Sequence, residues 1–178
     1  MRSLLVVLIC LSFLSAPAYC AAATVAKRNA LTLKTERVLS GIDIYNDSIE
    51  SVISHLGPPT RVSEKSTAAV YTWEKSACRI RVVVISGALE SGITAIDVWG
   101  KEECSGIGTT GHGLNLGAKL PEVRRTYGPP AYFIWKHPRP QILTFDPTCD
   151  TAPVLAIDFD ENGEVDHMKL TATDFYCF

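Results

Sequence analysis

The chain has 178 residues, of which 47% are hydrophobic and 20% charged, enough for one globular domain or two small ones. Its formal net charge is −2. Nucleic-acid binders usually carry a high pI or a marked basic patch, so we expect no nucleic-acid partner.

The first residues have the pattern of a secretory signal peptide, which we place at residues 1–23. Arg2 supplies a short positive region, residues 4–14 are apolar, and "SAPAYCAAA" (residues 15–23) offers small residues for cleavage. We expect cleavage between positions 18 and 23. The apolar run is too short to span a bilayer, so we expect a periplasmic or secreted protein without a transmembrane segment.

A lipid anchor on Cys20 would need small residues just before that cysteine. Pro17 and Tyr19 fit this requirement badly, so we expect no lipidation. Residues 24–40 are moderately polar and form a lead-in segment to the folded part of the chain.

The first expected helix lies over residues 49–56. Asp47 to Glu50 resemble a capping box with Asp47 as the N-cap. Apolar residues then recur at helical spacing at 49, 52, 53 and 56. Gly57 and the two prolines after it predict the helix end.

The same helix end recurs 71 residues later, where "RTYGPP" (residues 125–130) repeats "SHLGPP" (residues 54–59). "GIDI" (residues 41–44) likewise recurs as "GLNL" (residues 113–116). We interpret this as an internal duplication. It predicts repeat unit 1 at residues 41–105, a linker at 106–112 and repeat unit 2 at 113–178.

Strands are expected after each helix, because β-branched and aromatic residues alternate there between turn residues. The expected strands are residues 70–74, 78–86, 93–100, 132–136, 141–145, 154–160 and 164–172. The sequence therefore predicts an α+β fold of two tandem repeats, each a short helix, or a helical hairpin, packed on its own antiparallel sheet of three or four strands. The pair Tyr71 and Trp73 recurs as Phe133 and Trp135, and we assign such pairs to core packing.

Four cysteines remain after the leader, and an even number in a secreted chain predicts disulfides. A hairpin centred on Asn162-Gly163 places Cys149 opposite position 176. A hairpin centred near residues 89–90 places Cys78 opposite about position 101. The predicted bridges are therefore Cys78–Cys104 and Cys149–Cys177.

Alternation along the strands separates an apolar face, expected to cover the helices, from an open face. The open face carries charges and an indole, and Trp and Arg are frequent at binding hot spots. A solvated sheet face with charge pairs across strands is the alternative. The candidate partner-binding residues are Arg79, Arg81, Asp97, Trp99, Asp158, His167 and Lys169.

Two motifs imitate cofactor sites without meeting their requirements. "DFDENGEVD" (residues 158–166) begins like a calcium loop, but Lys169 occupies the position of the bidentate glutamate. "GIGTTGHGLNLG" (residues 106–117) is glycine-rich but lacks the lysine of a phosphate loop. The four histidines show no metal-ligand spacing. We expect no cofactor, no metal and no enzymatic activity.

The repeated entry motif, the "LG-P" helix end, the aromatic-x-Trp strand and the "NG" hairpin resemble SmpA/OmlA-like proteins of bacterial envelopes. Two such units in tandem resemble the β-lactamase-inhibitor-protein-like (BLIP-like) fold, over about residues 41–178. This resemblance implies a sheet that grips a protein partner.

Three functions follow as hypotheses. The first is a non-catalytic protein-binding module, in the form of an inhibitor or immunity-type protein. The second is an envelope-assembly or outer-membrane maintenance factor of SmpA/OmlA type. The third is a hydrolase that uses His167 with Asp158 or Asp160.

Overall fold

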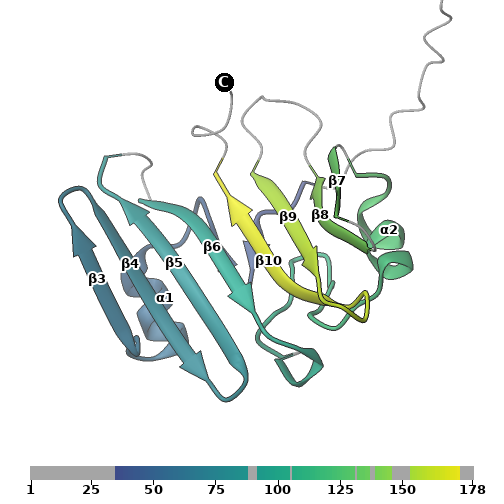
Figure 1. Ribbon diagram of the computed structural model, residues 1–178. Coiled ribbons are helices and arrows are strands. Elements are labelled where there is room, and N and C mark those ends of the chain that lie inside the picture. Colours follow the sequence, from purple (N-terminus) through teal and green to yellow (C-terminus); the bar gives the residue numbers. More distant parts are fainter. Residues whose placement is uncertain are drawn as a thin grey trace, which may run out of the picture. The chain divides into compact units, whose positions relative to one another are not determined.

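The computed structural model describes residues 35–87, 92–104, 106–130, 132–136, 139–145 and 153–172 (Figure 1). The predicted signal peptide, its cleavage site, Cys20 and most of the lead-in segment lie outside these residues. None of the helices in the described part is long and apolar enough to cross a membrane.

Two short helices and ten strands make up the described chain, together with one turn of 3-10 helix, η1 (Glu102–Cys104). The helices are α1 (Ile49–Leu56) and α2 (Leu120–Tyr127). The strands are β1 (Val38–Leu39), β2 (Ile42–Asp43), β3 (Arg61–Lys65), β4 (Ala68–Lys75), β5 (Cys78–Ile85), β6 (Ile93–Trp99), β7 (Tyr132–Lys136), β8 (Arg139–Phe145), β9 (Val154–Phe159) and β10 (Val165–Thr171).

The strands β3 to β10 form one antiparallel sheet of eight strands, in the order β3-β4-β5-β6-β10-β9-β8-β7 (Figure 1). The prediction of two tandem repeats, each with its own smaller sheet, is therefore wrong. The reason is the direct pairing of β6 with β10, from Ala95 opposite Thr171 to Trp99 opposite His167. This pairing leaves neither half of the chain with a separate sheet, and the fold is mainly β.

The helix α1 spans the predicted residues and α2 ends at the predicted Gly128, but the cap of α1 lies one residue later than predicted. Ser48 is the N-cap, and its Oγ accepts a hydrogen bond from the Ser51 amide at 3.3 Å. Asp47 instead accepts a hydrogen bond from the Ser51 hydroxyl. Each helix stops before a glycine with a φ of 81°, at Gly57 and Gly128, which is a conformation that favours glycine.

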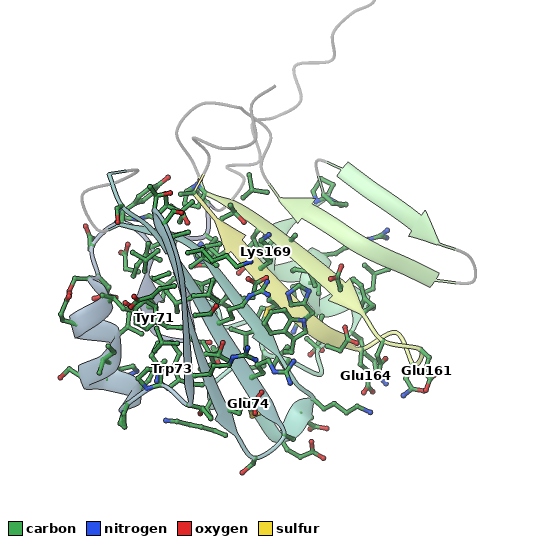
Figure 2. All side chains as sticks on the ribbon, turned by 60° about the vertical axis from the view of Figure 1, so that its left-hand side comes forward. Tyr71, Trp73, Glu74, Glu161, Glu164 and Lys169 are labelled. Atoms are coloured by element: carbon green, nitrogen blue, oxygen red, sulfur yellow. A yellow bond between two sulfur atoms is a disulfide. The ribbon has the colours of Figure 1, made fainter. Side chains whose placement is uncertain are left out.

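Tryptophan 73 joins α1 to the sheet. Its side chain is only 1% exposed, and its Nε1 donates a hydrogen bond to the carbonyl of Gly57 at 2.8 Å. The indole thereby fills the space under the helix and satisfies a carbonyl at the helix end. The predicted core role of Trp73 is confirmed, and Tyr71 is partly buried against the same core. Figure 2 labels both residues.

One hydrophobic cluster lies on the apolar face of the sheet, and it takes Val52 from α1 and Val123 from α2. Its fully buried strand residues alternate along β5, β6, β9 and β10 as the sequence predicts. They include Ile80, Val82, Ile96, Val98, Leu155, Ile157, Met168 and Leu170.

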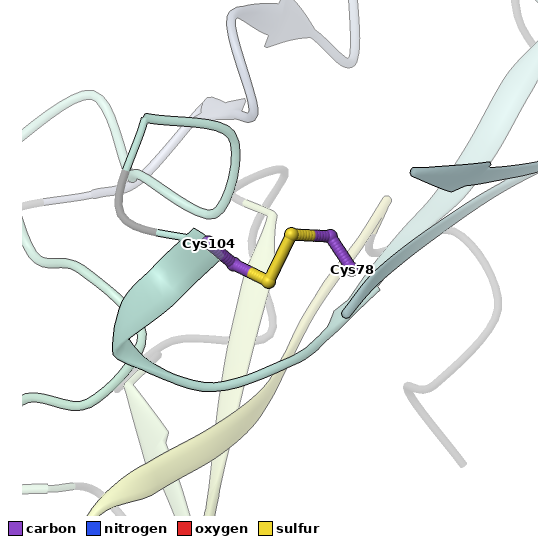
Figure 3. Close-up of a disulfide and its surroundings, with 2 residues drawn as sticks. All are labelled: Cys78 and Cys104. Atoms are coloured by element: carbon purple, nitrogen blue, oxygen red, sulfur yellow. A yellow bond between two sulfur atoms is a disulfide. The ribbon is translucent and has the colours of Figure 1, made fainter. Parts of the chain in front are cut away.

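The disulfide Cys78–Cys104 is present as predicted and joins the start of β5 to η1 (Figure 3). Its α-carbons lie 5.7 Å apart. A Cβ added to Gly100 would clash with Sγ of Cys104, so glycine at this position leaves room for the bridge. The predicted bridge Cys149–Cys177 falls outside the described residues.

A buried carboxylate fastens the first described residues to α2. Glu36 is 3% exposed and accepts hydrogen bonds from its neighbouring amides, from the His112 amide and from the Tyr127 hydroxyl. The Tyr127 hydroxyl also lies 2.6 Å from Oγ1 of Thr110. Residues of the predicted linker are thus part of the fold, since Gly111 also donates to the carbonyl of Val38.

Removing the disulfide should destabilise the fold. The double substitution Cys78→Ser/Cys104→Ser opens a loop between residues 26 positions apart, and we expect a loss of roughly 2–4 kcal/mol in the free energy of unfolding, because the unfolded chain gains freedom. Urea unfolding of both proteins measures this loss. Equal midpoints and slopes would contradict the role given to this bridge.

Removing the Tyr127 hydroxyl should also cost stability. Tyr127→Phe leaves the buried Glu36 and Thr110 each without one partner, and we expect a loss of about 1–3 kcal/mol. Tyr71→Phe is the matched control, because the Tyr71 hydroxyl has no hydrogen-bond partner among the described residues. Thermal unfolding of the two variants should separate them, and equal losses would show that the Glu36 network does not contribute.

Candidate functional site

Two rows of side chains cross the open face at the centre of the sheet. In the first row, Arg81 on β5 lies opposite Asp97 on β6, which lies opposite Lys169 on β10. The second row holds one residue each from β5, β6, β10 and β9, in the order Arg79, Trp99, His167 and Asp158. The strand registers therefore bring all seven predicted binding residues onto one face.

Asp97 is the centre of this arrangement although its side chain is only 2% exposed. Its Oδ2 accepts hydrogen bonds from Nε and a terminal nitrogen of Arg81 at 3.2 and 3.0 Å. Its Oδ1 lies 3.3 Å from Nε2 of His167. Burial by itself raises the pKa of Asp97, but the hydrogen bonds from His167 and Arg81 outweigh it and hold the pKa below its ordinary value.

His167 is held between two carboxylates. Its Nδ1 lies 2.6 Å from Oδ2 of Asp158, and its Nε2 faces Asp97. Burial by itself lowers the pKa of His167, but the hydrogen bonds with Asp158 and then Asp97 raise it to about 9. The side chain is therefore an imidazolium at neutral pH, with both ring nitrogens donating.

The indole of Trp99 packs against cations from the strands on both sides of β6. It stacks on the His167 ring, with centroids 4.6 Å apart and planes only 2° from parallel. The guanidinium carbon of Arg81 lies 4.9 Å from the indole centroid. Both contacts place a cation against the face of an aromatic ring, which is a favourable arrangement. They hold the partly buried indole in one orientation.

These contacts unite five of the seven predicted residues into what we call the open-face cluster: Arg81, Asp97, Trp99, Asp158 and His167. The other two predicted residues flank it. Arg79 is exposed and pairs with Glu74 at 3.1 Å. Lys169 (Figure 2) contributes through its charge, which helps to lower the pKa of Asp97.

The calcium-like motif forms the turn between β9 and β10. Oδ1 of Asp160 accepts hydrogen bonds from the amides of Asn162 and Glu164, and Gly163 takes a φ of 76°. The hairpin predicted at Asn162-Gly163 is thus confirmed, with His167 opposite Asp158. Among the described residues, no group of three His, Cys, Asp or Glu side chains could hold a metal ion.

The strand β3 was not predicted from the sequence, and neither were two exposed cations that it adds to the open face, Arg61 and Lys65. This strand lies at the edge of the sheet, and all five of its residues are exposed. It therefore lacks the buried apolar side chains found on β4, β5, β6, β9 and β10. The available signal was the alternation of Arg61, Ser63 and Lys65 just before the turn at Ser66 and Thr67.

The charge on His167 should make stability depend on pH. A raised pKa means that the stabilisation is fully present below about pH 6.5 and is lost as the pH rises through about 9. At pH 6 we expect His167→Gln to be less stable than the parent by up to about 3 kcal/mol, with the difference shrinking towards pH 10. Urea unfolding across this range measures it, and a constant difference would contradict the ionic role of His167.

No protein-family model matches this chain, and no curated protein matches its sequence. Among solved structures, an extracellular protein containing an SCP domain from Bacillus anthracis str. Ames is similar at 13% identity, with a TM-score of 0.50 over 72% of this chain and 43% of that one. A cysteine-rich secretory protein from Staphylococcus aureus shares 11% identity, with a TM-score of 0.49 over 77% of this chain and 47% of that one.

A DUF4309 family protein from Bacillus subtilis shares 18% identity, with a TM-score of 0.47 over 74% of this chain and 82% of that one. This chain spans less than half the length of the Bacillus anthracis and Staphylococcus aureus proteins. Identities this low show a likeness of fold with the Bacillus anthracis protein and nothing about function. The resemblance to SmpA/OmlA-like and BLIP-like proteins stays a prediction.

Proposed function

We propose that this chain is a secreted, non-catalytic protein-binding module that holds its partner on the open face of the sheet. The observation that carries the proposal is the partly buried indole of Trp99, fixed between Arg81 and His167. A rigid aromatic side chain loses little conformational entropy on binding, and such residues often dominate interfaces.

The charges around the indole support this role. Asp97 is buried and paired with Arg81 and His167, and His167 is paired with Asp158. A partner that covers the cluster therefore meets charges that are already compensated, which limits the cost of removing them from water.

Secretion is supported by the Cys78–Cys104 disulfide, because such bridges persist in oxidising compartments. The signal-peptide pattern of residues 1–23 points the same way. The similarly folded Bacillus anthracis protein is described as extracellular.

The chemistry of His167 argues against the hydrolase hypothesis. A general base needs a free nitrogen lone pair near neutral pH, whereas both ring nitrogens of His167 face carboxylates and its pKa is about 9. Asp160 is the other carboxylate of that hypothesis, and its Oδ1 already accepts hydrogen bonds from two amides of the turn. We therefore propose binding rather than catalysis as the role of this face.

Trp99→Ala should abolish partner capture. Immobilised mature protein with its disulfides intact is incubated with envelope and secreted fractions, and the retained proteins are identified by mass spectrometry. We expect retention of the specific partner to fall at least about tenfold, as for a hot-spot residue. Equal retention by parent and variant would contradict the proposal.

The matched control is Tyr45→Ala. The ring of Tyr45 also packs against an arginine, since the guanidinium carbon of Arg37 lies 5.7 Å from the ring centroid. Tyr45 follows β2 and is not part of the open face. This variant should retain the partner. Circular dichroism of both variants checks that neither result reflects unfolding.

A further inference from the structure

A groove of about 330 Å³ lies on the open face beside the cluster, over β3, β4 and β5. Three cationic side chains line it: Arg61 and Lys65 from the edge strand and Arg81 from β5. Other lining side chains are small, among them Ser63, Ala68 and Thr72. No carboxylate is among the described side chains that line the groove.

The cations of β3 are not compensated within the described part of the chain. Neither Arg61 nor Lys65 has a hydrogen-bond or ion-pair partner there. Glu64, between them in sequence, points to the opposite face because side chains alternate along a strand. Glu74 on the neighbouring strand is paired with Arg79. The groove therefore carries positive charge that an anionic ligand could neutralise.

Arg81, the third cation, still has N–H groups with which it can bind a ligand. Arg81 donates to Asp97 through Nε and one terminal nitrogen, and its side chain remains 41% exposed. A guanidinium has five N–H donors, so Arg81 can keep its contact with Asp97 and still donate to a ligand. It also contacts Trp99, which makes the groove continuous with the open-face cluster.

The spacing of the cations indicates the size of the ligand. Arg61 and Lys65 are four residues apart on one strand, or about 13 Å between α-carbons. Arg61 and Arg81 are aligned across β4 through Thr72, about 10 Å apart. A chain segment with several carboxylates matches this spacing, since it can place one carboxylate near each cation.

We propose that the groove binds an acidic segment of the protein partner, with carboxylates of Glu or Asp facing Arg61, Lys65 and Arg81. This inference rests on the proposed function and names the chemistry of the partner. Two copies of this chain facing each other groove to groove do not fit, since cations would meet cations. A nucleic acid fits less well, because the net charge of −2 would repel it outside the groove.

The test uses a short fluorescein-labelled peptide with glutamate at alternate positions, and the same peptide with glutamine. Fluorescence anisotropy with the full mature protein should show binding of the glutamate peptide only. Arg61→Gln/Lys65→Gln should weaken binding about five- to tenfold, since two exposed ion pairs are lost. Arg124→Gln, which removes a cation from the exposed side of α2, should leave binding unchanged.

Three outcomes would overturn the acidic-segment proposal. They are equal binding of the two peptides, equal binding by the parent and the Arg61→Gln/Lys65→Gln variant, and displacement of the peptide by equimolar inorganic phosphate. The last outcome would show a site for a small free anion instead.

The two proposals can fail separately. Trp99 does not line the groove, so Trp99→Ala should keep peptide binding while it loses partner capture. Capture that survives Arg61→Gln/Lys65→Gln but not Trp99→Ala would overturn the groove alone. Peptide binding that depends on Arg61 and Lys65, with capture unaffected by Trp99→Ala, would leave the groove standing and overturn the role of the indole.

Discussion

The pairing of β6 with β10 is the contact on which the rest of the structure depends. Five residue pairs join these strands, which are about 70 positions apart in the chain, and they make one sheet from strands that precede and follow α2. The pairing buries Ile96, Val98, Met168 and Leu170 on one face. On the other face the same registers bring Asp97 and Trp99 against His167. The core and the candidate site are thus two consequences of one strand alignment.

The buried charge of Asp97 is acceptable only because that alignment supplies its partners. A carboxylate excluded from water is costly unless hydrogen bonds and opposite charges compensate it. Arg81 comes from β5 and His167 from β10, so a shift of either strand by one residue would turn its cation to the apolar face. We infer that the ion pairs help to select the register of β5, β6 and β10 as well as to hold Trp99 in place.

The open face contains two regions of different electrostatic character. The open-face cluster has its charges paired internally and exposes an aromatic ring, which suits a contact that becomes dry on binding. The groove over β3 to β5 has cations without internal partners, which suits attraction and orientation of an acidic segment. Arg81 belongs to both regions. Under the proposed function, the charge of the groove attracts the partner and the indole anchors it.

Local signals in the sequence determined most of the elements. The apolar spacing before Gly57 and Gly128 marked both helices, and the alternation of apolar and polar residues marked seven of the eight strands of the large sheet and the face of every candidate residue. The Asn162-Gly163 turn set the register between β9 and β10, and hairpin geometry identified the partner of Cys78.

The tertiary structure alone decided that the two halves share one sheet, that Asp97 is buried, and that Glu36 meets Tyr127 across 91 residues. It also alone showed β3 and its groove. The physical reason is that local patterns depend on neighbours in sequence, whereas strand pairing between distant segments depends on the combined packing of the whole core.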